Sequence, residues 1–256
     1  MTHLNVNEYG DSTAHPVVLL SSIGTTHEAW EKQIPALEPH FRVLTVDHRG
    51  HGASERARVA QGATTMDALA ADIIHALDQA GVNRFNLVGL SLGGALAQYL
   101  AATTGRVDKA VFACTATYLG GEEKWSERTS IARSQGMSAL AGGMMENWFT
   151  EGFRASSPEE VQRIHDMVAG IDGEGYAQNG DALAGWDFAD RLGEITCPVL
   201  TIAGAQDPST TPADLERIAQ GVAGPVESVI IDPGSHQVAI ERPEEFNRAL
   251  TQFLRG

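Results

Sequence analysis

Short apolar runs rich in β-branched residues alternate with helical patterns along the chain, and this alternation restricts the fold more than any other feature. The runs are VVLLSS (17–22), FRVLTVD (41–47), FNLVG (85–89), KAVFAC (109–114), PVLTIAG (198–204) and ESVIID (227–232). Most of them lack polar alternation, as expected for parallel strands that are covered on both faces. The sequence therefore predicts an α/β fold with a mostly parallel, doubly wound sheet.

Apolar residues at helical spacing lie between these runs. One stripe spans residues 66–77, a second spans 92–100 and ends at Gly105, and a third spans 246–254 after Pro243. Proline is favoured in the first turn of a helix and glycine just after its end, so these residues mark helix boundaries. The three stripes predict helices that pack on the sheet.

The connection between Cys114 and Cys197 interrupts the alternation because it contains no convincing strand. It holds three of the four tryptophans. These are Trp125, Trp148 and Trp186. Such side chains suit an adaptable apolar wall, although each is equally compatible with the core of a small helical subdomain. We expect a core formed by residues 1–116 and 192–256, with a helical cap over residues 117–191 inserted after the strand that ends near Cys114.

The charge of the chain limits its partners. Acidic residues outnumber basic ones by 33 to 18, which gives a net charge of -15. This charge repels nucleic acid and anionic membranes, so we expect neither as a partner and expect a small-molecule substrate instead. The same charge repels an anionic substrate, so binding of such a substrate would need a local arginine. The sequence leaves the oligomeric state open.

The remaining composition argues for a cytoplasmic protein without a cofactor. The segment MTHLNVNEYG lacks the pattern of a signal peptide, and no apolar run approaches the roughly 18 residues that span a bilayer. The two cysteines adjoin apolar runs, so we expect buried packing residues rather than a disulfide. No cluster of cysteine and histidine has metal-ligand spacing, and no glycine-rich phosphate loop is present. We therefore expect neither a metal nor another cofactor.

Residues with catalytic chemistry follow four of the predicted strands. The segments after the strands are SSIGTT, GLSLGG, AQDPST and GSHQVA. In a parallel sheet the carboxyl ends of the strands meet at one edge, where ligands bind. A small-residue turn, a serine between two glycines, an acid and a histidine should therefore share that edge. This agreement is far more specific than the G-x-S-x-G match by itself.

On these residues the chain resembles an α/β-hydrolase from end to end. The stretches that carry the resemblance are DHRGHGAS (47–54), GLSLGG (89–94), IAGAQD (202–207) and GSH (234–236). The resemblance implies Ser91 as nucleophile, Asp207 as orienting acid and His236 as base. Asp190 and Asp232 remain alternatives to Asp207.

The oxyanion donors would be two backbone N–H groups, those of Ile23 and Leu92. Ile23 lies in the turn after VVLL, and Leu92 directly follows the serine. His48 and His51 belong to a stretch that forms a structural turn near the site in this fold. We therefore assign neither histidine a catalytic role.

Within the superfamily the chain is most similar to the 3-oxoadipate enol-lactonases. The stretches LLSSIGTTHEAWEKQIPAL (19–37), KWSERTS (124–130) and ENWF (146–149) carry this likeness. Ser21 departs from the pattern, because the lactonases more often have asparagine there. The usual first strand of the fold is expected to be absent or truncated.

This likeness implies a five-membered enol lactone with an acetate arm, which is opened through an acyl-enzyme to 3-oxoadipate. We hypothesise that Arg128 binds the carboxylate, while Trp125, one helical turn away, packs on the ring and Trp148 contributes to the same wall. Arg133 and Arg154 are competing anchors, and a solvated Arg128 is an equal alternative.

Other activities share the same framework. A carboxylesterase or a haloperoxidase-like hydrolase would keep the serine, acid and histidine and differ in the cap. A carbon–carbon bond hydrolase and a ligand receptor without turnover are weaker alternatives. A haloalkane dehalogenase is disfavoured because it has aspartate in place of Ser91.

Overall fold

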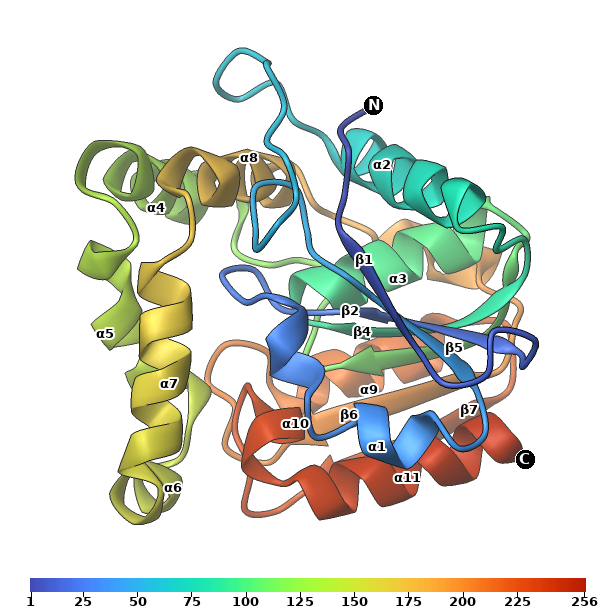
Figure 1. Cartoon of the computed structure of the whole chain (residues 1–256). Coiled ribbons are helices and arrows are strands. Elements are labelled where there is room, and N and C mark those ends of the chain that lie inside the picture. Colours follow the sequence, from blue (N-terminus) through green and yellow to red (C-terminus); the bar gives the residue numbers. More distant parts are fainter.

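The computed structural model describes all residues from Met1 to Gly256 and contains one seven-stranded sheet in the order β1-β3-β2-β4-β5-β6-β7 (Figure 1). The strands are β1 Val6–Tyr9, β2 Pro16–Leu20, β3 Arg42–Val46, β4 Phe85–Leu90, β5 Val107–Ala113, β6 Val199–Gly204 and β7 Val226–Ile231. All neighbouring pairs are parallel except β1 with β3, which is antiparallel. The carboxyl ends of the six parallel strands therefore lie along one edge.

Six of these strands coincide with the predicted apolar runs, and the predicted mostly parallel sheet is confirmed. The seventh, β1, was not predicted as a strand. It is only four residues long, its sequence VNEY contains no apolar run, and it pairs on one side only. The strand that we expected to be absent or truncated is thus represented by a short antiparallel edge strand. Because β1 lies at one edge of the sheet, it does not change the pairing of the strands from β2 to β7.

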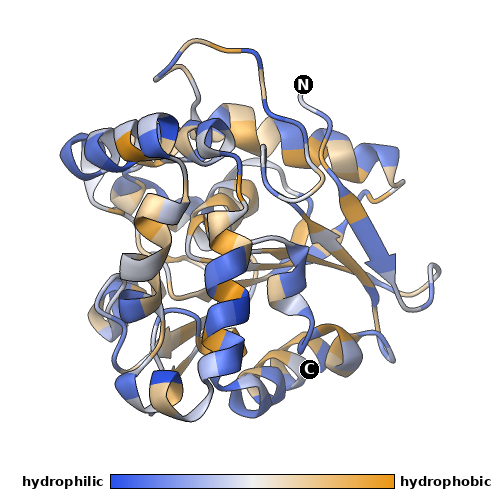
Figure 2. Ribbon diagram, turned by 60° about the vertical axis from the view of Figure 1, so that its left-hand side comes forward, coloured by the Kyte–Doolittle hydropathy of each residue, from blue (hydrophilic) through white to orange (hydrophobic).

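Helices cover both faces of the sheet and create two hydrophobic cores. One core lies under α2 Met66–Gln79, α3 Leu92–Thr103 and α9 Pro212–Gly221. The other lies under η1 His27–Trp30, α1 Ile34–Leu37, α10 Val238–Glu241 and α11 Pro243–Arg255. Figure 2 shows hydrophobic residues gathered in the central strands, with hydrophilic residues along the outer sides of the helices. The three predicted helical stripes correspond to α2, α3 and α11.

Five helices follow β5 before the chain returns to the sheet at β6. They are α4 Gly121–Gln135, α5 Ser138–Trp148, α6 Glu151–Ser156, α7 Pro158–Ala169 and α8 Gly173–Ala184, and the short helix η2 Ala189–Glu194 leads back to the core. They form a group beside the sheet (Figure 1), and their buried side chains continue the core under α2, α3 and α9. The two connections of this group to the core lie side by side, because Tyr118 and Asp187 form an isolated β-bridge. We use the term cap for residues 117–191.

The two cysteines are free. Cys114 is fully buried as expected, whereas Cys197 is only partly buried, which corrects the expectation for that residue. No helix is both long enough and apolar enough to cross a membrane.

Candidate active site

The predicted nucleophile lies in a sharp turn between β4 and α3. Ser91 has φ 59° and ψ -115°, a backbone conformation that L-residues rarely adopt. A Cβ atom on Gly89 would lie 2.0 Å from the carbonyl oxygen of Gly93, and one on Gly93 would lie 2.1 Å from that of Leu20. Neither position can accept a larger residue without a backbone shift. The two glycines around Ser91 are therefore required by close backbone contacts.

Backbone hydrogen bonds hold Ser91 on both sides. Its N–H donates to the carbonyl of Ala113 at 3.0 Å, and its carbonyl accepts from the Thr115 hydroxyl at 2.8 Å. The Ser91 hydroxyl itself makes no hydrogen bond within the protein, and Ser91 and His236 are not hydrogen-bonded to each other in this structure. Ser91 is therefore fixed through its backbone, which leaves its Oγ free to bind another group.

Asp207 and His236 come from the loops after β6 and β7 and are directly paired. Nδ1 of His236 lies 2.8 Å from Oδ2 of Asp207, and both side chains are buried. The other Asp207 oxygen accepts the N–H groups of Ser209 and Thr210, and the Thr210 hydroxyl donates to Oδ2. The structure thus brings together the acid and the base predicted from the sequence. Asp190, one of the two alternatives, lies in η2 and is exposed.

These contacts keep the Asp207 carboxyl ionised. Burial raises the pKa of Asp207, but the charge of His236 and the hydrogen bonds from His236, Thr210 and Ser209 outweigh burial, so the pKa is lowered overall. A carboxylate that accepts the proton on Nδ1 leaves Nε2 of the imidazole as the basic nitrogen. This is the tautomer that a base for a serine hydroxyl requires.

The turn after β2 supplies backbone donors beside Ser91. Neither the Ile23 N–H nor the Leu92 N–H donates a hydrogen bond within the protein. The Ser21 carbonyl accepts the N–H of Gly93 at 3.1 Å, which ties this turn to the first turn of α3. The two predicted oxyanion donors are therefore unpaired and belong to two segments that are hydrogen-bonded to each other.

Two buried histidines hold the same turn from the side of β3. Nε2 of His48 donates to the Ser21 carbonyl at 2.7 Å, and Nε2 of His51 accepts the Gly24 N–H at 2.9 Å. Burial and the neighbouring His48 lower the pKa of His51 to about 4, so its imidazole is neutral near pH 7 and can accept this bond. The sequence predicted that these histidines lie near the site. Only the hydrogen bonds in the structure show that they support the turn after β2.

The cap covers this turn with aromatic and sulfur-containing side chains. A Cβ atom on Gly24 would lie 3.0 Å from Met144, 3.6 Å from Tyr176 and 3.7 Å from Trp148. Trp148 also stacks on His236, with ring centroids 6.3 Å apart and an angle of 30° between the planes. Trp148 therefore packs against the predicted base, and its part in binding substrate stays a prediction.

Arg128 is bound to this wall without a carboxylate partner. Its guanidinium donates two hydrogen bonds, at 3.1 and 2.9 Å, to the hydroxyl of the buried Tyr176. The same guanidinium lies 5.5 Å from the ring centroid of Trp125, whose indole N–H donates to the Leu119 carbonyl. Arg128 is therefore an ordered, half-buried cation rather than a solvated surface residue.

The two competing arginines are engaged elsewhere. Arg133 forms ion pairs with Glu174 at 2.8 Å and Asp181 at 2.6 Å. Arg154 donates to the backbone carbonyls of Glu146 and Phe149. Neither arginine has a free charge facing the wall around Trp125.

Lys124 is an exposed cation beside Trp125 that the sequence reasoning missed. It precedes Arg128 by one helical turn, its ammonium lies 6.0 Å from the Trp125 ring centroid, and it has no ion pair. Desolvation and the charge of Arg128 lower its pKa, and the charge of Asp207 opposes this shift. The sequence places Lys124 four residues before Arg128, but only the structure shows that its ammonium lies beside the Trp125 ring.

Comparisons with known proteins agree with this geometry. A family model described as the alpha/beta hydrolase fold matches residues 15–127. A 3-oxoadipate enol-lactonase of Acinetobacter baylyi is 34% identical over 98% of this chain and 93% of its own length. The chain belongs to the α/β-hydrolase family. The predicted family and fold are thus confirmed.

Two solved structures of α/β-hydrolases show the same architecture. The enol-lactonase from Burkholderia xenovorans has a TM-score of 0.94 and 35% identity, with 100% of this chain and 97% of that chain covered. A thermophilic esterase from Thermogutta terrifontis has a TM-score of 0.92 and 26% identity, with 99% and 93% covered. This α/β-hydrolase is accordingly an enzyme that acts on carboxylic-ester bonds.

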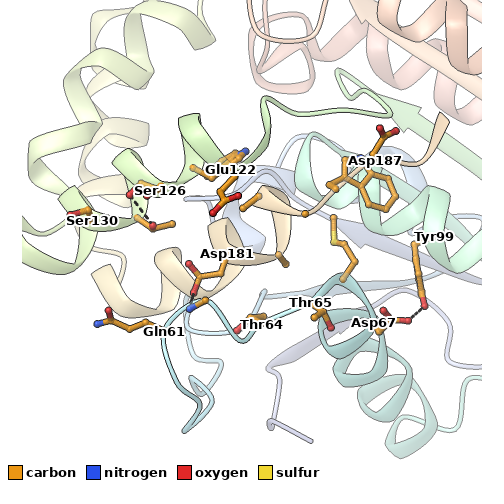
Figure 3. A pocket seen from close by; sticks show the side chains of 18 of the residues that line it. Gln61, Thr64, Thr65, Asp67, Tyr99, Glu122, Ser126, Ser130, Asp181 and Asp187 are labelled. Atoms are coloured by element: carbon orange, nitrogen blue, oxygen red, sulfur yellow. Dashed lines mark hydrogen bonds between the residues drawn. The ribbon is translucent and has the colours of Figure 1, made fainter.

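A large groove of this α/β-hydrolase does not coincide with the candidate site. Its volume is about 990 Å³, and it lies where α2 and α3 meet α4 and α8. Figure 3 shows Asp67, Asp181 and Asp187 around it, with the Tyr99 hydroxyl bonded to Asp67. Trp125 lines the groove, but the predicted nucleophile, acid, base and oxyanion residues do not. We assign the chemistry to the strand ends because the reactive side chains gather there.

Proposed function

We propose that this α/β-hydrolase opens a small enol lactone with a carboxylate arm, 3-oxoadipate enol-lactone, to give 3-oxoadipate. The observation that carries the proposal is Arg128, a half-buried guanidinium that Tyr176 holds at the wall of the site without an acidic partner. In a chain with a net charge of -15, a cation kept free of carboxylates suits an anionic substrate. The similarity to two enol-lactonases supports the same substrate class.

In the first half of the reaction, Ser91 attacks the lactone carbonyl. His236 takes the hydroxyl proton on Nε2, while Asp207 accepts the Nδ1–H and stabilises the imidazolium. The unpaired N–H groups of Ile23 and Leu92 donate to the oxygen that becomes negative. The product of this step is a tetrahedral intermediate bonded to Ser91.

In the second half, collapse of the intermediate breaks the ring C–O bond. The leaving group is an enolate, which departs with little acid catalysis. It then takes the proton from the His236 imidazolium and ketonises, so His236 is neutral again. Water, deprotonated by His236, then attacks the acyl-enzyme and releases a carboxylate, and Ser91 regains its proton. The reaction as written uses no metal and no cofactor.

The cap would hold the substrate by its charge and by its ring. Arg128 presents a planar fork that matches a carboxylate, and Lys124 adds a second positive charge one helical turn away. Trp125 packs on the lactone ring, and Trp148 closes the wall beside His236. The acetate arm thereby points toward α4 and the lactone carbonyl toward Ser91.

Steady-state kinetics with the acidic enol lactone and its neutral methyl ester test this proposal. We expect a clear preference for the acid. Arg128→Ala should raise the KM for the acid about 10- to 100-fold, because a hydrogen-bonded charge pair is lost, and should leave the methyl ester unaffected.

Arg154→Ala is the matched control, because this cap arginine bonds only to backbone carbonyls. It should leave the KM of both substrates unchanged. Equal effects of Arg128→Ala on the acid and on the methyl ester would contradict the anchor.

A carboxylesterase that acts on other small esters is the second candidate. The similarity to the Thermogutta terrifontis esterase favours it. A higher kcat/KM for neutral esters than for the acidic lactone would support this alternative and overturn the lactonase proposal.

A further inference from the structure

A small internal cavity lies directly behind the candidate active site. Its volume is about 10 Å³, measured as the space open to the centre of a water-sized sphere. The residues that line it are Ser21, Ser22, Ala29, Trp30, Leu90, Gln237 and Ala239. All seven are buried, so the cavity is inside the protein.

Three of the lining residues each carry a buried polar atom that has no hydrogen-bond partner in the protein. These atoms are Oγ of Ser22, Nε1 of Trp30 and Nε2 of Gln237. These residues expose only 1%, 2% and 2% of their surface. Leaving such a group unpaired costs about 1–3 kcal/mol, so three of them on residues that line one cavity point to a shared polar partner.

The volume and the chemistry of the cavity identify that partner. A single water molecule needs about 10–15 Å³ in this measure and makes two to four hydrogen bonds when buried. The indole N–H of Trp30 and the amide N–H of Gln237 are both donors, and water can accept both. The Ser22 hydroxyl can accept the hydrogen that such a water donates.

The lining residues are neighbours of the predicted catalytic groups in the chain. Ser22 precedes the oxyanion donor Ile23, Leu90 precedes Ser91, and Gln237 follows His236. Trp30 is the last residue of η1 and packs in the second hydrophobic core, under α11. A molecule bound to all three polar atoms would therefore connect the turn after β2 with the loop that carries the base.

We propose that this cavity binds one ordered water. This water holds the turn after β2 and the loop that carries His236 in fixed positions relative to each other. Ser22, Trp30 and Gln237 are thus positioning residues that act through the water and do not contact substrate. The positioning half of this inference rests on the proposed serine mechanism, whereas the water site itself does not.

A high-resolution crystal structure of the whole chain tests the water site without any assay. We expect a density peak within hydrogen-bond distance of Ser22 Oγ, Trp30 Nε1 and Gln237 Nε2. A cavity without density would overturn the site, as would a turned Gln237 amide whose oxygen bonds directly to the Trp30 indole.

Kinetics of Ser22→Ala, Gln237→Met and the double variant test the positioning role. Each single variant should lower kcat about fivefold, as expected for one lost hydrogen bond, and leave KM unchanged. Because both side chains act through one water, the double variant should be no slower than the worse single variant. Independent, multiplying effects, or an unchanged kcat in both single variants, would overturn the positioning role.

Thr45→Val supplies the matched control for Ser22→Ala. The Thr45 hydroxyl is also buried and unpaired, but it lies in β3 and not on this cavity. Its removal should leave kcat unchanged and the protein as stable or more stable. The assay uses any ester that the enzyme hydrolyses, such as p-nitrophenyl acetate. A missing lactonase activity would therefore contradict the proposed function alone.

Discussion

The carboxylate of Asp207 is saturated with hydrogen bonds, and this determines the behaviour of the paired imidazole. Two backbone N–H groups occupy one oxygen, while Thr210 and His236 share the other. The carboxylate cannot rotate without breaking several bonds. The orientation of His236 is therefore set by the loop after β6 as much as by its own loop.

Asp207→Asn is expected to reduce kcat by about 10⁴-fold with little change in stability. The amide keeps the size of the carboxylate but no longer stabilises the imidazolium, and it favours the wrong tautomer. Hydrolysis of p-nitrophenyl acetate, with a thermal unfolding curve for each variant, measures both quantities.

Asp190→Asn serves as the control for this change, since Asp190 is the exposed alternative acid in η2. It should retain full activity. A fully active Asp207→Asn protein would remove Asp207 from the mechanism.

His51 predicts a pH dependence of folding stability. Its pKa is about 4 in the folded protein and about 6.5 when unfolded, because burial disfavours the charged form. Between these values only the unfolded chain binds the proton, so the free energy of unfolding falls as the pH decreases from 6.5 to 4. Over this window the loss from His51 is about 3 kcal/mol, and the stabilisation is complete above pH 6.5.

His51→Gln keeps an acceptor for the Gly24 N–H but removes the titrating group. Urea unfolding at several pH values should show a smaller decline between pH 6.5 and 4 for this variant than for the unchanged protein. Identical slopes would mean that His51 is charged in both states or in neither.

The turn between β4 and α3 can form only because Gly89 has no side chain. Gly89→Ala places a methyl group 2.0 Å from a backbone oxygen, so the strand and the helix must separate. We expect a loss of about 3 kcal/mol or more in the free energy of unfolding, together with loss of activity. Urea denaturation measures the first effect.

Gly142→Ala is the comparison for this variant. Gly142 lies in α5, and a Cβ atom there would meet nothing within 4 Å. Because alanine is the better helix former, this change should stabilise the protein by up to about 1 kcal/mol. Similar destabilisation by both substitutions would contradict the steric account.

The elements that could be predicted from the sequence are those with a strong hydrophobic pattern. Most of the six parallel strands are nearly continuous apolar runs because helices cover both of their faces. The edge strand β7, with the sequence VESVII, is partly exposed. The strand β1 escaped prediction, since its four residues VNEY contain no apolar run and it lies at an edge. The cap was predicted as an insertion, but the packing of its helices depends on contacts between residues far apart in the chain.

In the candidate site, too, local sequence patterns predicted some residues, while others depend on packing between distant parts of the chain. The placement of Ser91, Asp207 and His236 at one sheet edge was predictable because each follows a parallel strand, whereas their catalytic roles came from the family resemblance and stay predictions. The places of Lys124 and Tyr176 were not predictable, because they depend on how α4 packs on α8. The supporting hydrogen bonds of His48 and His51 also required coordinates, as each histidine binds a turn more than twenty residues earlier in the chain.

The charge of the whole protein predicts a dependence on salt. A net charge of -15 repels an anionic lactone at long range, and salt screens this repulsion more than it screens the half-buried Arg128. Raising the ionic strength from low to physiological values should therefore increase kcat/KM for the acid about twofold. The neutral methyl ester should show no change. A decrease for the acid would mean that the local cations dominate its approach.

The cap is fastened to the loop that carries the base. Buried Glu241 accepts hydrogen bonds from Thr150 of the cap and from the Ser235 N–H, and the Gln237 N–H donates to the Trp148 carbonyl. Lifting this end of the cap would drag the imidazole away from Asp207 and interrupt proton transfer. We therefore expect substrate to enter and product to leave beside α4 and α8. Substrate access and proton transfer would then depend on opposite ends of the cap.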